Sequence, residues 1–130
     1  MSLVAMHHAV DPASKLKKEL GPLDDIEIFH NQVLAAVYIR PEQTAGGVYL
    51  TETTRGEDRF QSKVGLIVKT GANAFVDPDG VWFKDVNLAV GDWVIFRPSD
   101  GWSITINGVL CRILDDTVIR GTTKNPDKVW

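Results

Sequence analysis

Cysteine is almost absent from this 130-residue chain: Cys111 stands alone, so no disulfide can form within it. No run of about 18 apolar residues occurs, and the stretch from Leu3 to Val10 is short and lacks a basic flank, so we expect neither a membrane span nor a signal peptide. Positive charge is not in excess, because the formal net charge is −3. These absences argue against a membrane protein and against a nucleic-acid partner, and the lone cysteine is compatible with a reducing cytoplasm.

Groups that carry out catalysis are also scarce. Two of the three histidines, His7 and His8, lie near the N-terminus, and the serines and threonines have no nearby histidine to activate them. Cys111 is centred in a strand pattern, which predicts a buried small hydrophobe rather than a reactive thiol. Asp77 and Asp79 lack the spacing of a calcium-binding loop and are better explained by a turn. The sequence therefore predicts neither an enzyme nor a metal site.

What the chain does contain is a succession of short strand patterns separated by turn residues. Strands are predicted at residues 26–28, 33–39, 64–68, 93–96, 103–106, 109–114 and 118–120. Residues 33–39 carry apolar side chains on both faces, which predicts a strand that is covered on both sides. Asn107-Gly108 suits a type I′ turn between two of the strands. The length predicts one domain, and the pattern predicts an all-β fold, a small antiparallel barrel.

The N-terminal segment differs from the rest of the chain. Asp11 can cap a helix that begins at Pro12 and ends at Gly21-Pro22. A helix this short is marginal alone in water, so two alternatives stay open: the segment is poorly ordered, or it docks on the surface. The predicted division of the chain is an appendage at residues 1–23, a barrel domain at 24–123 and a C-terminal tail at 124–130.

A long polar segment, from Arg40 to Asp58, separates two strand patterns and holds one short apolar patch, Val48-Tyr49-Leu50. Gly46-Gly47 removes backbone restraint just before this patch. Loops of this length inside a compact domain are usually functional or disordered. Two interpretations remain open: the patch becomes ordered in a groove on a partner, or it forms a short strand of the domain's own sheet.

A second hairpin is predicted between Gly71 and Asp85. Phe75-Val76 and Val81-Trp82-Phe83 flank Asp77-Pro78-Asp79-Gly80, which is a strong turn signal. The arms carry more apolar side chains than an ordinary exposed hairpin tip. Either they fold back onto the barrel, which is the simpler interpretation, or they meet copies of themselves in an assembly.

Four segments carry a further signal through their order and spacing: Phe29–Leu34, Thr44–Thr51, Val64–Val68 and Val86–Phe96. The most specific pieces are Thr-Ala-Gly-Gly followed by an apolar tripeptide, and Val-Asn-Leu-Ala-Val-Gly-Asp-Trp-Val-Ile-Phe. Together the segments resemble the GroES co-chaperonin family, over roughly residues 25–122. The resemblance implies a GroES-like β-barrel and a co-chaperonin that caps an ATP-bound chaperonin ring through a mobile loop, closing the chamber for assisted protein folding.

The same resemblance implies a role for each segment. The mobile loop would span about residues 40–62, with the chaperonin-binding residues Gly46, Gly47, Val48, Tyr49 and Leu50. The roof β-hairpin would span about residues 71–85, with Phe75, Asp77, Asp79, Val81, Trp82 and Phe83. Trp102 would face the cavity. At the subunit interface, the strand holding Ile26 and Ile28 would pair with the neighbour's strand holding Val118 and Ile119, which would also cover two exposed sheet edges.

The implied partners are a GroEL-like chaperonin, whose apical domains receive the loop, and a non-native client protein inside the chamber. The chain itself would form a homo-oligomer, as in the heptamers of the family, and would work in the cytoplasm. No cofactor is implied for this chain, because ATP and magnesium belong to the chaperonin partner. Neither nucleic acid nor membrane enters this scheme.

Several departures from the family pattern stand out. Tyr49 occupies a position that is usually aliphatic, and its hydroxyl requires water or a partner. The N-terminal appendage and the C-terminal tail are additional, the loop is longer, and the roof is less polar than expected. We expect such divergence, with a larger or less polar dome, of a phage-encoded co-chaperonin working in its host's cytoplasm.

Two other classes of protein stay in view. A structural or decoration protein built on the same small barrel would use the loop as a docking arm, and its binding would not depend on nucleotide. A catalytic-domain fragment of the medium-chain alcohol dehydrogenase type shares the barrel, but those enzymes bind zinc through cysteine and histidine. Here the barrel has only Cys111 and His30, which disfavours this third class.

Overall fold

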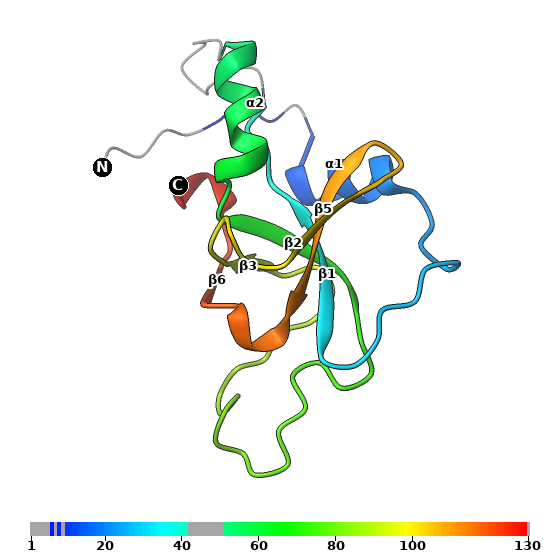
Figure 1. The fold of residues 1–130 in the computed structure, drawn as a ribbon. Coiled ribbons are helices and arrows are strands. Elements are labelled where there is room, and N and C mark those ends of the chain that lie inside the picture. The colour runs from blue at the N-terminus through cyan, green and yellow to red at the C-terminus, as the bar shows by residue number, and fades with distance from the viewer. Residues whose placement is uncertain (1–5, 7, 9, 42–50, 130) are drawn as a thin grey trace.

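A single antiparallel sheet of six strands forms the centre of the molecule in the computed structural model (Figure 1). The structure describes Met6, His8, residues 10–41 and residues 51–129. The strands are β1 (Gln32–Val37), β2 (Val64–Thr70), β3 (Trp93–Ile95), β4 (Trp102–Ile106), β5 (Val109–Asp115) and β6 (Gly121–Thr123), in the sheet order β4-β5-β1-β2-β3-β6. The helices are α1 (Pro12–Leu20), α2 (Glu52–Gln61) and two 3₁₀ turns, η1 (Asp116–Val118) and η2 (Pro126–Lys128). The all-β fold class is confirmed.

Strand β1 lies near the middle of the sheet and is covered on both faces, as its sequence predicts. Val33 and Ala35 belong to one buried apolar cluster, whereas Leu34, Ala36 and Tyr38 belong to another on the opposite face. The first cluster is completed by Ile67, Val94, Phe96 and Leu114, and the second by Leu20, Val64, Leu66, Trp93, Val109 and Cys111. Buried apolar clusters therefore cover both faces of the sheet, and the loops begin where these packed strands end.

The predicted turn between β4 and β5 is present. Asn107 and Gly108 both have positive φ, at 49° and 79°, as a type I′ turn requires. The five residue pairs of this ladder run from Trp102 opposite Ile113 to Ile106 opposite Val109. The hairpin is thus set by local turn chemistry together with strand alternation.

Helix α1 has the predicted bounds and is docked on the barrel. The Asp11 carboxylate accepts a hydrogen bond from the Ser14 backbone N–H at 3.1 Å, and Pro12 occupies the first turn. Leu20 is only 1% exposed and belongs to the core, with Leu16 packed against the same cluster. Of the two alternatives left open by the sequence, docking is the one observed.

Helix α2 corrects the expectation of a loop over residues 40–62. Its residues Glu52–Gln61 are helical, so the C-terminal half of the predicted loop contains a helix. The predicted chaperonin-binding residues 46–50 lie outside the described residues. One residue of this helix, Asp58, forms a long-range ion pair with Arg40, described below, which no local pattern signals.

Residues 71–85 do not form the paired strands of a β-hairpin. The segment is a series of turns, in which the Gly80 N–H bonds the Asp77 carbonyl at 3.1 Å and the Phe83 N–H bonds the Asp77 carboxylate at 2.8 Å. Phe75 has a φ of 60°, which interrupts any extended arm. The Asp77–Gly80 turn was therefore correctly predicted, but the ladder on either side of it was not.

Two further strand predictions are wrong within this single chain. Residues 118–120 are not a strand: the 3₁₀ turn η1 includes Val118, and the last strand begins at Gly121. Asp116 holds this turn, because its buried carboxylate accepts hydrogen bonds from Asn31 and from Phe75. Residues 26–28 form no strand in the described chain. Among the described residues, no helix is long and apolar enough to cross a bilayer.

Candidate functional site

The two chain segments that bound residues 42–50 come together at one end of the molecule. Arg40 and Pro41 follow β1, and Thr51 leads into α2, which projects from the sheet at the end opposite the turns of residues 71–85 (Figure 1). The predicted docking residues themselves, Gly46 to Leu50, lie outside the described residues. What the structure shows is therefore how the base of this loop is held.

An ion pair between Arg40 and Asp58 joins the two sides of the loop base. The Asp58 carboxylate accepts three hydrogen bonds from Arg40: from its backbone N–H at 3.2 Å, from Nε at 3.0 Å and from Nη2 at 2.9 Å. Asp58 is 1% exposed. The hydrogen bond with Asp58 raises the pKa of Arg40, while burial opposes this rise. A bidentate guanidinium–carboxylate pair of this kind is both strong and directional.

Backbone and hydroxyl groups tie the end of α2 to the end of β1. The Ser62 hydroxyl donates to the Tyr38 carbonyl at 2.7 Å, and the Tyr38 N–H donates to the Val64 carbonyl at 2.9 Å. Ser62 is 2% exposed. The segments on either side of the loop, at Tyr38 and at Ser62, are therefore hydrogen-bonded to each other and to β2.

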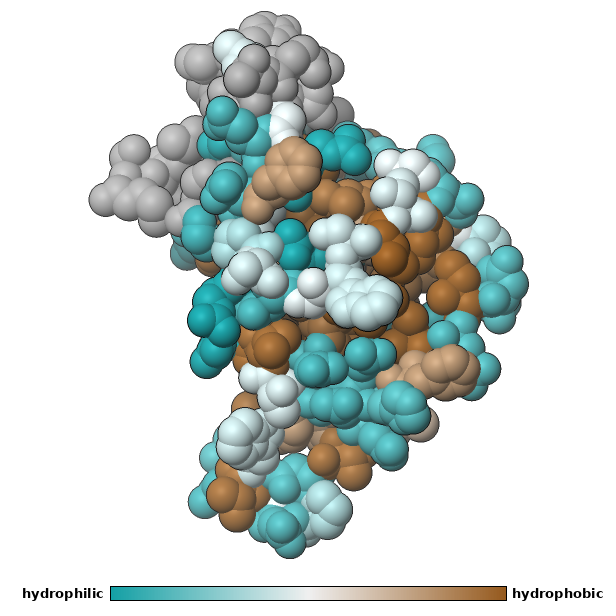
Figure 2. Space-filling model, in the orientation of Figure 1, coloured by the Kyte–Doolittle hydropathy of each residue, from teal (hydrophilic) through white to brown (hydrophobic). Residues whose placement is uncertain are grey.

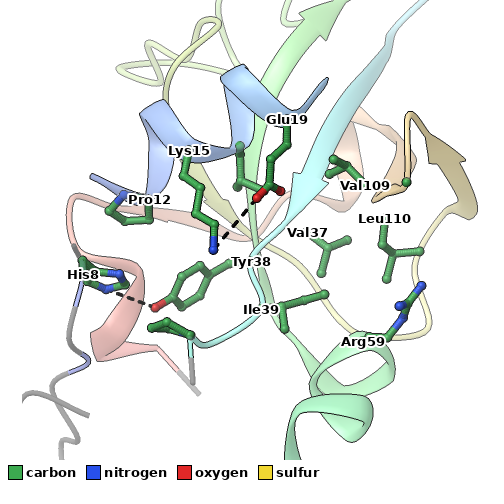
Figure 3. A pocket seen from close by; sticks show the side chains of 13 residues that line it. His8, Pro12, Lys15, Glu19, Val37, Tyr38, Ile39, Arg59, Val109 and Leu110 are labelled. Atoms are coloured by element: carbon green, nitrogen blue, oxygen red, sulfur yellow. Dashed lines mark hydrogen bonds and ion pairs between the residues drawn. The ribbon is translucent and has the colours of Figure 1, made fainter. Parts of the chain in front are cut away.

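A second polar cluster brings both ends of the chain to the same place. The Tyr38 hydroxyl donates to the Asp127 carboxylate, and Nε2 of His8 lies 3.1 Å from the same carboxylate. The same His8 nitrogen lies 3.4 Å from the Tyr38 hydroxyl (Figure 3). The backbone N–H of Met6 also donates to Asp127, at 3.2 Å. Burial, followed by the hydrogen bond with Asp127, raises the pKa of Tyr38 far above its ordinary value. Residues before and after the barrel thus meet beside Arg40.

A small cavity of about 190 Å³ lies between α1, the end of β1, the β4–β5 turn and α2 (Figure 3). Tyr38, Arg59 and Val109 are among its lining residues, and Lys15 and Glu19 approach each other to 3.9 Å beside it. Within the described residues, no group of three or more His, Cys, Asp or Glu side chains is placed to hold a metal ion. The cavity is therefore a feature of the loop base, bounded by α1 and α2.

The predicted roof residues divide into two groups. Phe75 packs against the cluster that contains Phe96, so the interpretation that this segment packs on the barrel holds for it, and Phe83 packs edge-to-face on Phe75 with ring centroids 5.5 Å apart. Val81 and Trp82 are instead 77% and 67% exposed. Asp77 and Asp79 belong to the turn at the tip.

Apolar residues reach the surface around this tip. The lobe at the bottom of Figure 2 shows apolar patches among polar residues. A cavity of about 550 Å³ beside them is lined partly by Phe83, Leu88 and Ile119. Trp102, on the edge strand β4, is 75% exposed.

The residues predicted for a subunit interface are half-buried within their own chain. Ile28 packs against the cluster that contains Leu20, whereas Val118 and Ile119 pack against the cluster that contains Phe96. No ladder joins these segments within the described residues of the chain. Their pairing between neighbouring subunits stays a prediction.

Cys111 is inaccessible. It is 0% exposed, and burial raises the pKa of its thiol to about 11. A thiol that is buried and protonated at neutral pH is a poor nucleophile. The prediction that Cys111 is a structural side chain is confirmed.

Two polar clusters escaped the sequence analysis: Arg40 with Asp58, and His8 with Tyr38 and Asp127. The members of the first pair are 18 residues apart, and no periodic pattern or motif links them. The second cluster joins opposite ends of the chain, which topology alone brings together. Neither had a signal in the order of residues.

One comparison with known proteins bears on this arrangement. The sequence model of the family described as "Chaperonin 10 Kd subunit" matches residues 25–123. The match covers the whole sheet, both roots of the loop and the turns of residues 71–85, and it leaves out α1 and η2. A search of curated proteins found no match.

Proposed function

The chain belongs to the chaperonin 10 kDa subunit family, whose members are non-catalytic co-chaperonins, and we propose that it caps an ATP-bound, GroEL-like chaperonin ring. The observation that carries the proposal is the family match over residues 25–123, which includes the loop, its base and the roof segment. The proposed result of capping is a closed chamber in which a non-native client protein folds.

The loop between Arg40 and α2 is the proposed contact with the chaperonin. Val48, Tyr49 and Leu50 supply apolar area for a groove between two helices of an apical domain, and Gly46-Gly47 permits the backbone to adapt. Ordering a loop at each binding event weakens the single contact. Several loops on one ring, a heptamer by family resemblance, bind together and restore affinity while remaining releasable.

The turns of residues 71–85 are the proposed roof of the dome, and Trp102 the proposed aromatic facing the chamber. The support for the roof is geometric, because α2 and these turns lie at opposite ends of the sheet (Figure 1). A lid that binds the chaperonin at the loop end would place the turns farthest from it. The proposal assigns no cofactor to this chain, leaves ATP and magnesium on the chaperonin, and places the complex in the cytoplasm.

Co-elution with a tetradecameric bacterial chaperonin in size-exclusion chromatography, with and without ATP, tests the proposal. We expect the unaltered chain to co-elute only with nucleotide and Leu50→Asp to lose this binding, because an aspartate cannot be buried unpaired in an apolar groove. Val90→Asp is the matched control, since Val90 is exposed and distant in sequence from the loop.

Binding that is absent, or equally strong without nucleotide, would overturn the capping role. Nucleotide-independent binding by a stable oligomer would favour the alternative, a structural or decoration protein that uses the loop as a docking arm. Binding that survives Leu50→Asp would instead move the contact away from the apolar tripeptide.

A further inference from the structure

The described side chains of helix α2, those of residues 56–61, attach it to the barrel by charge rather than by apolar packing. Phe60 is 71% exposed, and Glu57, Arg59 and Gln61 are also exposed. From Gly56 to Gln61, Asp58 is the only residue whose side chain is fully buried. An isolated helix of ten residues is marginal in water, so α2 requires a tertiary contact. Arg40 supplies one to the buried Asp58 within the helix, and the Ser62 hydroxyl ties the residue after its end to Tyr38.

The geometry of this contact suits an anchor. Arg40 supplies three donors to one carboxylate, all within 3.2 Å, and its own side chain is 20% exposed while that of Asp58 is 1% exposed. A buried carboxylate deprived of its partner is strongly unfavourable, so loss of Arg40 would drive Asp58 toward water and pull α2 away from the sheet.

We infer that Arg40 and Asp58 form a latch that holds α2 in place and thereby positions the chaperonin-binding loop. The inference rests on the proposed function and names two positioning residues for it. With the latch closed, the segment left to become ordered on the chaperonin ends at α2. With the latch broken, the residues of α2 must also become ordered at each binding event.

The expected effect on affinity is large because ordering is costly. Fixing the backbone of one additional residue weakens a binding constant by about tenfold. A broken latch adds up to a whole helix to the segment that must order, so we expect Asp58→Asn to weaken nucleotide-dependent binding by about tenfold or more. On a ring with several loops, the loss compounds with each loop that engages.

The first measurement uses the free protein and needs no chaperonin. Amide hydrogen exchange is compared for the unaltered chain, Arg40→Gln, Asp58→Asn and Arg97→Gln. Arg97 pairs with Asp100 at 3.5 Å through a more exposed guanidinium away from the loop, and serves as the control for loss of an arginine charge. We expect the first two substitutions to remove protection of the α2 amides while β1, β2 and β5 stay protected, and Arg97→Gln to leave α2 unchanged.

Arg40→Lys gives a milder version if the stronger variants fail to fold. It keeps the positive charge but loses the bidentate geometry of the guanidinium, so intermediate protection of α2 is expected. Tryptophan fluorescence, to which the core residue Trp93 (7% exposed) contributes alongside the other three tryptophans, reports independently whether the barrel remains folded. Unchanged α2 protection in every folded variant would overturn the latch.

The second measurement is nucleotide-dependent binding to the chaperonin, with a rescue variant. Gly56 lies inside α2, and a methyl group added there meets no atom within 4 Å, so Gly56→Ala should stabilise the helix. Added to Asp58→Asn, it should recover part of both the lost protection and the lost affinity. Such recovery distinguishes ordering of α2 from a direct contact of Asp58 with the chaperonin.

Each outcome decides a different point. Loss of α2 protection with unchanged affinity would overturn the positioning role and leave a purely structural ion pair. Lost affinity without rescue would place Asp58 in the contact itself and also overturn the inference. If the unaltered chain binds no chaperonin, the proposed function fails together with the positioning role, while the exchange data still show whether the ion pair holds α2.

Discussion

Tyr38 is the residue where the strand, the loop base and both ends of the chain converge. Its ring packs edge-to-face with Trp93 at a centroid distance of 5.6 Å, and its hydroxyl donates to Asp127. Because the side chain is buried, its protonated form is favoured in the folded state, and the pKa of Tyr38 is raised. One residue therefore links the apolar core to the polar cluster beside Arg40.

This raised pKa predicts a loss of stability in alkaline solution. Above about pH 10, the ordinary pKa of tyrosine, the unfolded chain releases a proton that the folded chain retains, so the free energy of unfolding falls as pH rises. Tyr38→Phe cannot titrate and should show a shallower decline. Denaturant unfolding of both proteins between pH 7 and 11 measures the difference.

At neutral pH the same substitution should cost about 1–2 kcal/mol, because it removes a buried hydrogen bond and leaves Asp127 with one fewer donor. Trp102→Phe, at an exposed site, is the control and should change stability little. Equal alkaline slopes for the unaltered chain and Tyr38→Phe would show that Tyr38 is not protected from ionisation by the fold.

Among the elements, the 3₁₀ turn η1 connects the sheet to the proposed roof. The Asp116 carboxylate accepts a hydrogen bond from Asn31 Nδ2 at 2.9 Å and another from the Phe75 backbone N–H at 2.9 Å, while its own N–H donates to the Asn31 carbonyl. One buried carboxylate thereby joins the start of β1, the end of β5 and the turns of residues 71–85.

Asp116→Ala should therefore destabilise the protein by about 2–4 kcal/mol, since it leaves two donors without an acceptor. Asp115→Ala is the matched control: Asp115 is exposed, and its described side-chain contact is a 3.3 Å hydrogen bond with Gln32. Chemical unfolding measures both variants, and a similar small loss in the two would contradict the assigned role. Increased proteolysis within residues 71–85 would locate the damage.

How far the sequence predicts these elements depends on whether their causes are local. Alternation in residues 33–39 and the Asn107-Gly108 turn are local, and both appear as predicted. By contrast, Asp58 in α2 and Asp116 before the last strand are bound by partners that lie far along the chain. A sequence pattern within a short window contains no information on such pairs. The sequence therefore predicts no helix at α2, and it predicts the last strand three residues before β6.

At the scale of the whole molecule, the sheet has two edges, β4 and β6, that no other strand of the described residues covers in the single chain. Unpaired edges invite association, and a closed ring is one way to satisfy them without open-ended aggregation. Residues 26–29 run outside the sheet without a strand partner, and Phe29 is 59% exposed. These features agree with the homo-oligomer expected of the family, and a contact of residues 26–29 with the neighbour's segment that leads into β6 stays a prediction.

Light scattering coupled to size-exclusion chromatography tests that contact. We expect the unaltered chain to form a discrete ring and Phe29→Asp to dissociate at higher protein concentration, because burying a side chain of this size contributes about 1.5–3 kcal/mol that an aspartate cannot supply. Val90→Asp adds the same charge at a site that is 54% exposed, and it should leave the ring intact. Equal dissociation of the two variants would exclude residues 26–29 from the interface, since general charge repulsion would then explain both. A ring that weakens only with Phe29→Asp would also lose chaperonin affinity, because each loop contact gains its strength from the others on the same ring.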